Sequence, residues 1–176
     1  YAPEIRHAFI TYGNWTMGQT WSTFMDTNAL PDSLDFIGGT DGAVFVRQGL
    51  LRYTQGNWQF SVENPETTVT NFGGAARNVT DDNGFPDLVA RYNHKASWGA
   101  MSVAVLMRQL STETATVNDS TQGYGVSVSG KANVTADDEL RFTVNTGSGM
   151  GRYMSLNTGN DAAASATGQL EAIDSQ

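Results

Sequence analysis

The sequence lacks several features, and each absence narrows the class of protein. It has no cysteine, only 4 prolines among 176 residues, and only 16% charged residues. A disordered chain would be richer in charge and poorer in aromatic residues. No run of about 18 apolar residues occurs, so the sequence predicts no transmembrane helix. The net charge of -8 argues against nucleic acid as a partner, because binding to phosphates needs clustered Lys and Arg.

What the sequence does contain is a recurring alternation of apolar and polar residues with a period of two, which is typical of β-strands. We expect eight strands, at residues 5–13, 15–24, 43–55, 58–64, 87–95, 98–110, 121–131 and 139–149. Both ends of the sequence look cut, and we therefore expect part of a longer chain, with residues 1–176 forming a single domain.

The connections between these strands alternate between short and long. Short turns fall at 13–14, 56–57, 96–97 and 132–138, and long polar loops fill 25–42, 65–86, 111–120 and 150–176. Transmembrane barrels have short periplasmic turns and long extracellular loops. The sequence therefore predicts an all-β fold, a transmembrane antiparallel up-and-down β-barrel. The Ala-rich stretch 162–168 is interpreted as part of a mobile loop.

The two faces of the predicted strands differ in polarity. In residues 58–63, for example, Trp58, Phe60 and Val62 share one face and the polar residues share the other. In a membrane barrel the apolar face contacts lipid and the polar face lines the lumen. Aromatic pairs bracket three short turns, as expected of a girdle at the membrane interface: Tyr12 and Trp15, Tyr53 and Trp58, and Tyr92 and Trp98. Ordinary cross-strand aromatic pairing is the alternative explanation.

Charged residues on the predicted strands are mostly basic, whereas most carboxylates fall in loops and turns. The candidate pore-lining residues are Arg47, Arg52, Arg91, Arg108, Lys131, Arg141 and Glu63. A basic wall favours the passage of anions, although each Arg could instead pair with a neighbouring carboxylate. Strand parity places Arg47 on the outward face with Leu51 and Tyr53, which is costly in lipid. A bulge near Gly49 or a position at the rim would remove this conflict.

Several segments resemble the DcaP-like outer-membrane porins, in order and across nearly the whole chain. They are Gly18-Gln-Thr-Trp-Ser-Thr-Phe-Met-Asp26, Leu34-Asp-Phe-Ile-Gly-Gly39, Val46-Arg-Gln-Gly-Leu-Leu-Arg-Tyr53, Val62-Glu-Asn-Pro65, Phe85-Pro-Asp-Leu-Val-Ala-Arg-Tyr92 and Gly125-Val-Ser-Val-Ser-Gly-Lys131. The resemblance implies a 16-stranded trimeric barrel in the bacterial outer membrane, of which the eight strands here are half. It also implies the passage of small anions such as dicarboxylates.

The resemblance gives the loop at 25–42 a possible role, because one long loop of a porin folds into the lumen and narrows it. Asp35 and Asp41 are the candidate residues of this constriction loop, facing Arg47, Arg52 and Arg91 across the pore. Outer-membrane lipid, lipopolysaccharide and two further copies of the chain are the other expected partners.

No cofactor, metal site or catalytic centre is expected, because no nucleophile elbow, metal-binding helix or phosphate loop is present. Two other functions remain open at this point. A soluble all-β binding module, of the carbohydrate-binding kind, would place Trp15, Trp58 and Trp98 in a core or on a sugar-stacking face. A non-conducting membrane barrel would use its loops for adhesion.

Overall fold

The computed structural model describes residues 5–32, 42–74 and 77–175, and its main element is one nine-stranded antiparallel sheet. Neighbouring strands follow one another along the sheet in chain order. The strands are β1 (Ala8–Tyr12), β2 (Trp15–Trp21), β3 (Arg47–Gln55), β4 (Trp58–Glu63), β7 (Asp87–Ala96), β8 (Gly99–Glu113), β9 (Asn118–Asn133), β10 (Glu139–Ser148) and β13 (Asp174–Ser175). The eight predicted strands are thus confirmed, and within the described residues β1 and β13 form the two edges.

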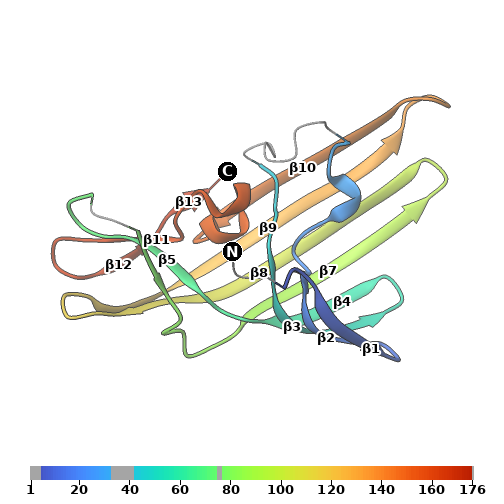
Figure 1. Ribbon diagram of the computed structural model, residues 1–176. Coiled ribbons are helices and arrows are strands. Elements are labelled where there is room, and N and C mark those ends of the chain that lie inside the picture. Colours follow the sequence, from blue (N-terminus) through green and yellow to red (C-terminus); the bar gives the residue numbers. More distant parts are fainter. Residues whose placement is uncertain (1–4, 33–41, 75–76, 176) are drawn as a thin grey trace.

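The sheet is a curved trough with two different ends (Figure 1). At the end that we call the turn end, tight hairpins join β1 to β2, β3 to β4 and β7 to β8. Two of these hairpins are two-residue turns with glycine first, and Gly13 and Gly56 both have φ +57°. This is the type II′ geometry, whose twist matches that of paired strands. The opposite end, which we call the loop end, carries the longer connections.

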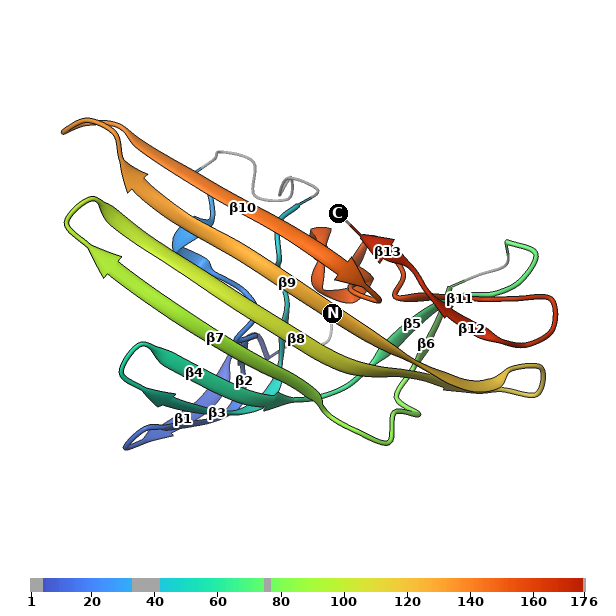
Figure 2. The same ribbon diagram turned by 180° about the vertical axis from the view of Figure 1, so that it is seen from behind.

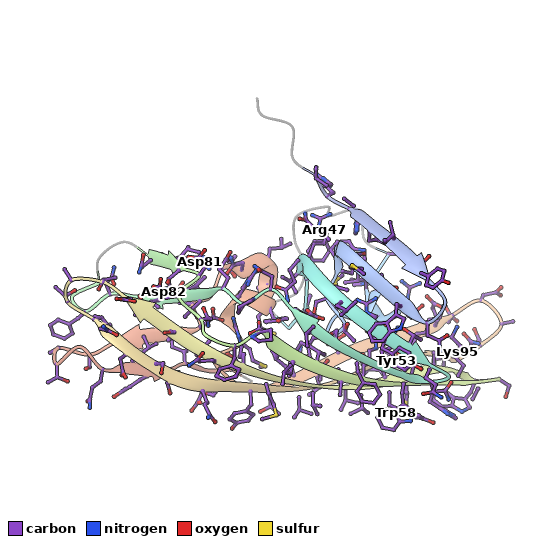
Figure 3. The ribbon with its side chains drawn as sticks, turned by 90° about the horizontal axis from the view of Figure 1, so that it is seen from below. Arg47, Tyr53, Trp58, Asp81, Asp82 and Lys95 are labelled. Atoms are coloured by element: carbon purple, nitrogen blue, oxygen red, sulfur yellow. The ribbon has the colours of Figure 1, made fainter. Side chains whose placement is uncertain are left out.

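The polarity of the two faces of the sheet is inverted relative to that in a water-soluble protein. Residues that the strand register places side by side on the convex face are large, apolar and exposed. They include Trp15, Met17, Trp58, Phe60, Val62, Leu88, Val103, Val105, Met107, Tyr124 and Val144. On the concave face Ser102, Ser127 and Ser129 are buried. Figure 3 shows Tyr53 and Trp58 projecting from the convex face near the turn end.

Two inner segments cross the concave face and form an apolar core against it. The segment after β2, which includes the 3-10 helix η1 (Thr27–Ala29), and the segment leading into β3 run across β7 to β10 (Figure 1). Phe24, Val44 and Tyr153 pack in this core against Leu106 of the wall. Tyr153 belongs to the 3-10 helix η2 (Gly151–Tyr153), which is followed by η3 (Ser155–Asn157).

A second sheet of four short strands covers the loop end of the trough, to the left in Figure 1. It consists of β5 (Thr67–Thr70), β6 (Arg77–Thr80), β11 (Ala162–Ala164) and β12 (Leu170–Ala172), in the order β12-β11-β5-β6. Strands β5 and β11 are parallel, with Val69 opposite Ala162. Both residues are buried in a small core with Leu110 of the wall.

This second sheet and one long hairpin correct the sequence-based expectations. Residues 65–86 and 150–176 are not simple loops, and the Ala-rich stretch contains strand β11, in which Ala162 is fully buried. Residues 111–120 are not a long loop either, because β8 and β9 continue to a tight turn at residues 114–117. The polar residues that suggested a loop continue both strands beyond the apolar part of the convex face. This extension is visible at the right of Figure 2.

A pair of glycines lets the inner segments lie close to the wall. Gly125 of β9 is the register partner of Gly147 of β10. A Cβ atom added at either position would overlap the side chain of Met150, which is fully buried. In the described part of the chain, no helix is long and apolar enough to span a bilayer.

Candidate functional site

A hollow of about 500 Å³ lies on the concave face near the turn end. Arg52 of β3 and Arg91 and Lys95 of β7 line it, together with polar groups such as Gln59 and Asn93. Period-two alternation explains the placement, since side chains two or four positions apart on a strand share a face. No described residue that lines the hollow is a carboxylate. The hollow is therefore a basic, hydrogen-bonding surface.

Arg91 is held by an inner segment. Its Nη2 lies 2.7 Å from Asp26 Oδ1, and both side chains are almost fully buried. Its Nε donates to Asn93 Oδ1 at 2.7 Å and its Nη2 donates to Ser102 Oγ at 2.7 Å. Ser129 Oγ donates to the other Asp26 oxygen at 2.9 Å. The charge of Arg91 is thus neutralised, and its main role is to fix the inner segment to β7 and β9.

Burial acts to raise the pKa of the Asp26 carboxyl. The positive charge of Arg91 and hydrogen bonds from Arg91, Ser129 and the backbone of Asn28 outweigh it, and together they hold the pKa below the ordinary 3.8. Asp26 is therefore ionised at neutral pH, and the ion pair with Arg91 is intact.

Arg52 and Lys95 differ from Arg91 because no described carboxylate lies within salt-bridge distance of either. Arg52 Nε donates to Thr23 Oγ1 at 2.7 Å, and its Nη2 donates to the carbonyl oxygen of Trp21 at 2.5 Å. These two partners are neutral and position the guanidinium, while the buried Glu63 carboxylate acts on its charge from beyond salt-bridge distance. Figure 3 places Lys95 near the turn end of the sheet, where Tyr53 and Trp58 also lie but on the opposite face.

Arg108 and Glu63, two more of the candidate residues, lie on the concave face inside a buried polar network. The fully buried Arg108 guanidinium pairs with Asp161 at 2.7 Å and with Asp87 at 3.4 Å. Glu63 accepts hydrogen bonds from Thr23 N at 2.8 Å and from Gln48 Nε2 at 2.6 Å, among others. Asp161 also accepts from the backbone N–H of Thr68 on β5, so this network ties the second sheet to the wall.

Lys131 and Arg141 lie opposite each other on β9 and β10 toward the turn end. Lys131 Nζ is 3.4 Å from Glu139, and Arg141 also pairs with Glu139. Arg141 Nη2 reaches Asp32 of the inner segment at 2.6 Å. Both basic residues therefore lie on the concave face with carboxylates beside them. Asp35 and Asp41 lie outside the described residues, whereas residues 25–32 of the same loop do cross the concave face.

Arg47 is placed differently from the other candidates and is removed from the pore-lining set. It pairs in register with Trp21, and the register from Arg47 to Tyr53 runs without a bulge, so its side chain is on the convex side. Its guanidinium carbon lies 4.5 Å from the Trp21 ring centroid and 6.0 Å from that of Phe45. Of the two explanations considered for this residue, the rim position is the one the structure supports, because Arg47 is the first residue of β3, at the strand end away from the turn end (Figure 3).

Two residues of this site are not among those predicted from the sequence. Lys95 carried a usable signal, because it lies four positions after Arg91 on one strand and so shares its face. Asp26 carried none, since it lies in a loop whose path depends on tertiary packing. No group of three or more His, Asp or Glu residues that could hold a metal ion occurs among the residues described.

A curved antiparallel sheet with an apolar convex face and a charged, hydrogen-bonded concave face is the wall of a transmembrane β-barrel. The soluble binding module is thereby excluded, because it would bury its apolar face. The chain belongs to the DcaP outer membrane protein family, whose profile matches residues 2–171. The protein is accordingly located in the bacterial outer membrane.

The fold is shared with a solved structure of an outer membrane channel, DcaP of Acinetobacter baumannii. The TM-score is 0.77 at 24% sequence identity. The match covers 93% of the present chain and 46% of that channel, so the chain spans about half of its length. No curated protein matches the chain.

Proposed function

We propose that the protein is part of a passive diffusion channel that favours small anionic solutes, dicarboxylates included. The observation that carries this proposal is the hollow lined by Arg52 and Lys95, two cations on neighbouring parts of the wall with no described carboxylate in the lining. A cluster of one charge sign on a low-dielectric wall raises the local concentration of counter-ions. Basic linings select for anions in pores.

The orientation of the barrel in the membrane follows from the two ends of the sheet. In outer-membrane barrels the short turns face the periplasm and the long connections face the exterior. The second sheet and the inner segments then narrow the outer part of the lumen, and the basic hollow forms part of its periplasmic half. A solute would pass the constricted part first and the Arg52–Lys95 surface afterwards.

Ion selectivity tests this proposal. The full-length protein, extracted from the outer membrane in detergent, is inserted into a planar bilayer, and the reversal potential is measured under a salt gradient. We expect anion selectivity in the wild type and a shift toward neutrality in the double variant Arg52→Gln/Lys95→Gln. The matched control is Arg77→Gln, which removes one charge from an exposed residue of β6 at the loop end.

Equal reversal potentials in the wild type and the double variant would contradict the basic-wall proposal. Membrane-inserted protein that conducts no current would instead favour the adhesion barrel. That second candidate has one observation in its favour, because an apolar core and a second sheet occupy part of the concave face. The family resemblance also leads us to propose a homotrimer, which chemical cross-linking of the membrane-embedded protein would detect as a three-chain product.

A further inference from the structure

Positive charge that the proposed channel does not use gathers at the rim where β3 begins and the convex face meets the inner segments. Arg6, Arg47 and Arg152 line one hollow of about 350 Å³ there, together with Glu66 and with Leu156 and Asn157 of η3. Arg152 Nε lies 3.4 Å from Glu66 Oε1, so this carboxylate is engaged by one of the three arginines. Neither Arg6 nor Arg47 has a described carboxylate within salt-bridge distance.

The position of Arg47 indicates what it faces. It lies on the same side of β3 as Leu51 and Tyr53, which belong to the apolar convex face, and opposite to Arg52 on the concave face. A guanidinium at the edge of a lipid-facing surface keeps its apolar stem against the protein and extends its charge to the headgroup level. The rings of Trp21 and Phe45 beside it are of the kind found at membrane interfaces.

Contact with these rings also prepares Arg47 to bind an anion. The guanidinium lies over the Trp21 ring, and an arginine that contacts an aromatic ring in this way can still donate N–H groups to other partners. An arginine fork matches two oxygens of a phosphate group, and such charge-assisted contacts are among the strongest hydrogen bonds in proteins. Arg6, which is exposed, adds a second cation to the same hollow.

We propose that Arg6 and Arg47 form a binding site for the phosphate of a lipid headgroup in the outer leaflet of the membrane. Clusters of basic side chains beside an apolar membrane-facing surface recognise phosphorylated lipid headgroups in this way. In the outer leaflet of a bacterial outer membrane the phosphorylated lipid is lipid A. Arg47 differs in this respect from Arg52 of the basic hollow, which lies on the opposite face of β3.

Retention of lipid tests the proposal. The full-length protein is extracted from its native membrane in mild detergent, and native mass spectrometry measures lipid A bound per protein chain. We expect the double variant Arg6→Gln/Arg47→Gln to bind lipid A about tenfold more weakly, the change expected when charge-assisted contacts are lost. Lys131→Gln, which removes a charge toward the turn end, is the matched control and should retain lipid like the wild type. Arg47→Lys should fall between these two, because it keeps the charge and loses the fork.

A second measurement separates the lipid from free phosphate. We expect bisphosphorylated lipid A to raise the Tm of the delipidated wild type but not that of the double variant. Dephosphorylated lipid A and inorganic phosphate should change neither. Equal lipid retention by all variants would overturn the proposal, as would equal stabilisation by inorganic phosphate. A double variant with normal lipid retention and an altered oligomer mass would assign this rim to contacts between subunits instead.

Discussion

Arg91 of strand β7 and Asp26 of an inner segment form an ion pair at 2.7 Å on the concave face of the sheet. This pair joins the wall to a chain segment that crosses it, and the Ser129 hydroxyl fixes the same carboxylate from β9. The path of the inner segment therefore depends on one carboxylate with partners on two strands. That dependence makes Asp26 the most informative position for perturbing the inner segment.

Asp26→Ala should release the inner segment and leave the Arg91 charge uncompensated on the concave face. Removing one partner of a buried pair costs about 3–5 kcal/mol, so we expect a lower free energy of unfolding in lipid vesicles. We also expect stronger anion selectivity, measured by reversal potential, because Arg91 gains an exposed charge. Asp137→Ala, in the exposed turn between β9 and β10, serves as the control. Unchanged selectivity and stability would show that other contacts suffice to hold the segment.

The pKa of the Asp26 carboxyl also determines how the stability of the protein responds to acid. Because the pKa of Asp26 is lower in the folded protein than its ordinary 3.8, its contribution is fully present above that value and is lost as the pH falls through the folded pKa. The Tm difference between wild type and Asp26→Asn should therefore stay constant from about pH 7 to pH 5 and shrink only below about pH 4. A difference that already declines between pH 7 and pH 5 would contradict the ionised pair.

The energetic cost of a basic side chain on the convex face should depend on its depth in the bilayer. Val105 lies in the middle of β8, with Met101, Val103 and Met107 on the same face. Val105→Arg should destabilise the folded protein by about 2–4 kcal/mol, the cost of a basic side chain at the bilayer midplane. Gln122→Arg, on the same face of β9 but closer to the loop end, should cost less than about 1 kcal/mol. Unfolding by urea in lipid vesicles measures both, and similar costs would show that this face does not contact lipid.

The glycine pair opposite Met150 predicts a specific coupling between two substitutions. Gly125→Ala introduces a Cβ that would overlap Met150, and overpacking of this kind costs about 1–3 kcal/mol. Met150→Ala alone leaves a cavity in the inner core. The double variant should be more stable than the sum of the two single effects predicts, since the smaller residue at 150 accepts the new methyl group. Additive losses in the same unfolding measurement would show that Met150 moves aside without cost.

The wall of this protein could be predicted from the sequence because lipid on one side and polar groups on the other impose a strict period of two. Residues 58–63 are an example, in which every second side chain is aromatic or aliphatic and every other one is polar. Near the tips this contrast is lost, so the sequence predicts a loop at residues 111–120, where β8 and β9 in fact continue as strands. Parity alone also placed Arg47 on the convex face, where the structure has it.

The inner layer could not be predicted, because nothing local specifies it. Strand β11 consists of three alanines and β5 of four residues, too short for any period to be recognised. The parity of β8 predicted that Arg108 faces inward. Its partner Asp161, 53 residues further along the chain, is brought there by the docking of the second sheet. Contacts of this kind depend on tertiary packing and leave no pattern in the neighbouring sequence.

The parallel pairing of Val69 with Ala162 has a consequence for the order in which the protein is assembled. Strand β5 follows the fourth strand of the wall, but its neighbour β11 is made only after β10 is complete. A parallel pair between such distant residues forms late, because the long intervening chain must be closed first. We therefore expect a stage of folding in which the wall has formed and its mouth is still uncovered. Docking of β11 would end that stage by covering the mouth.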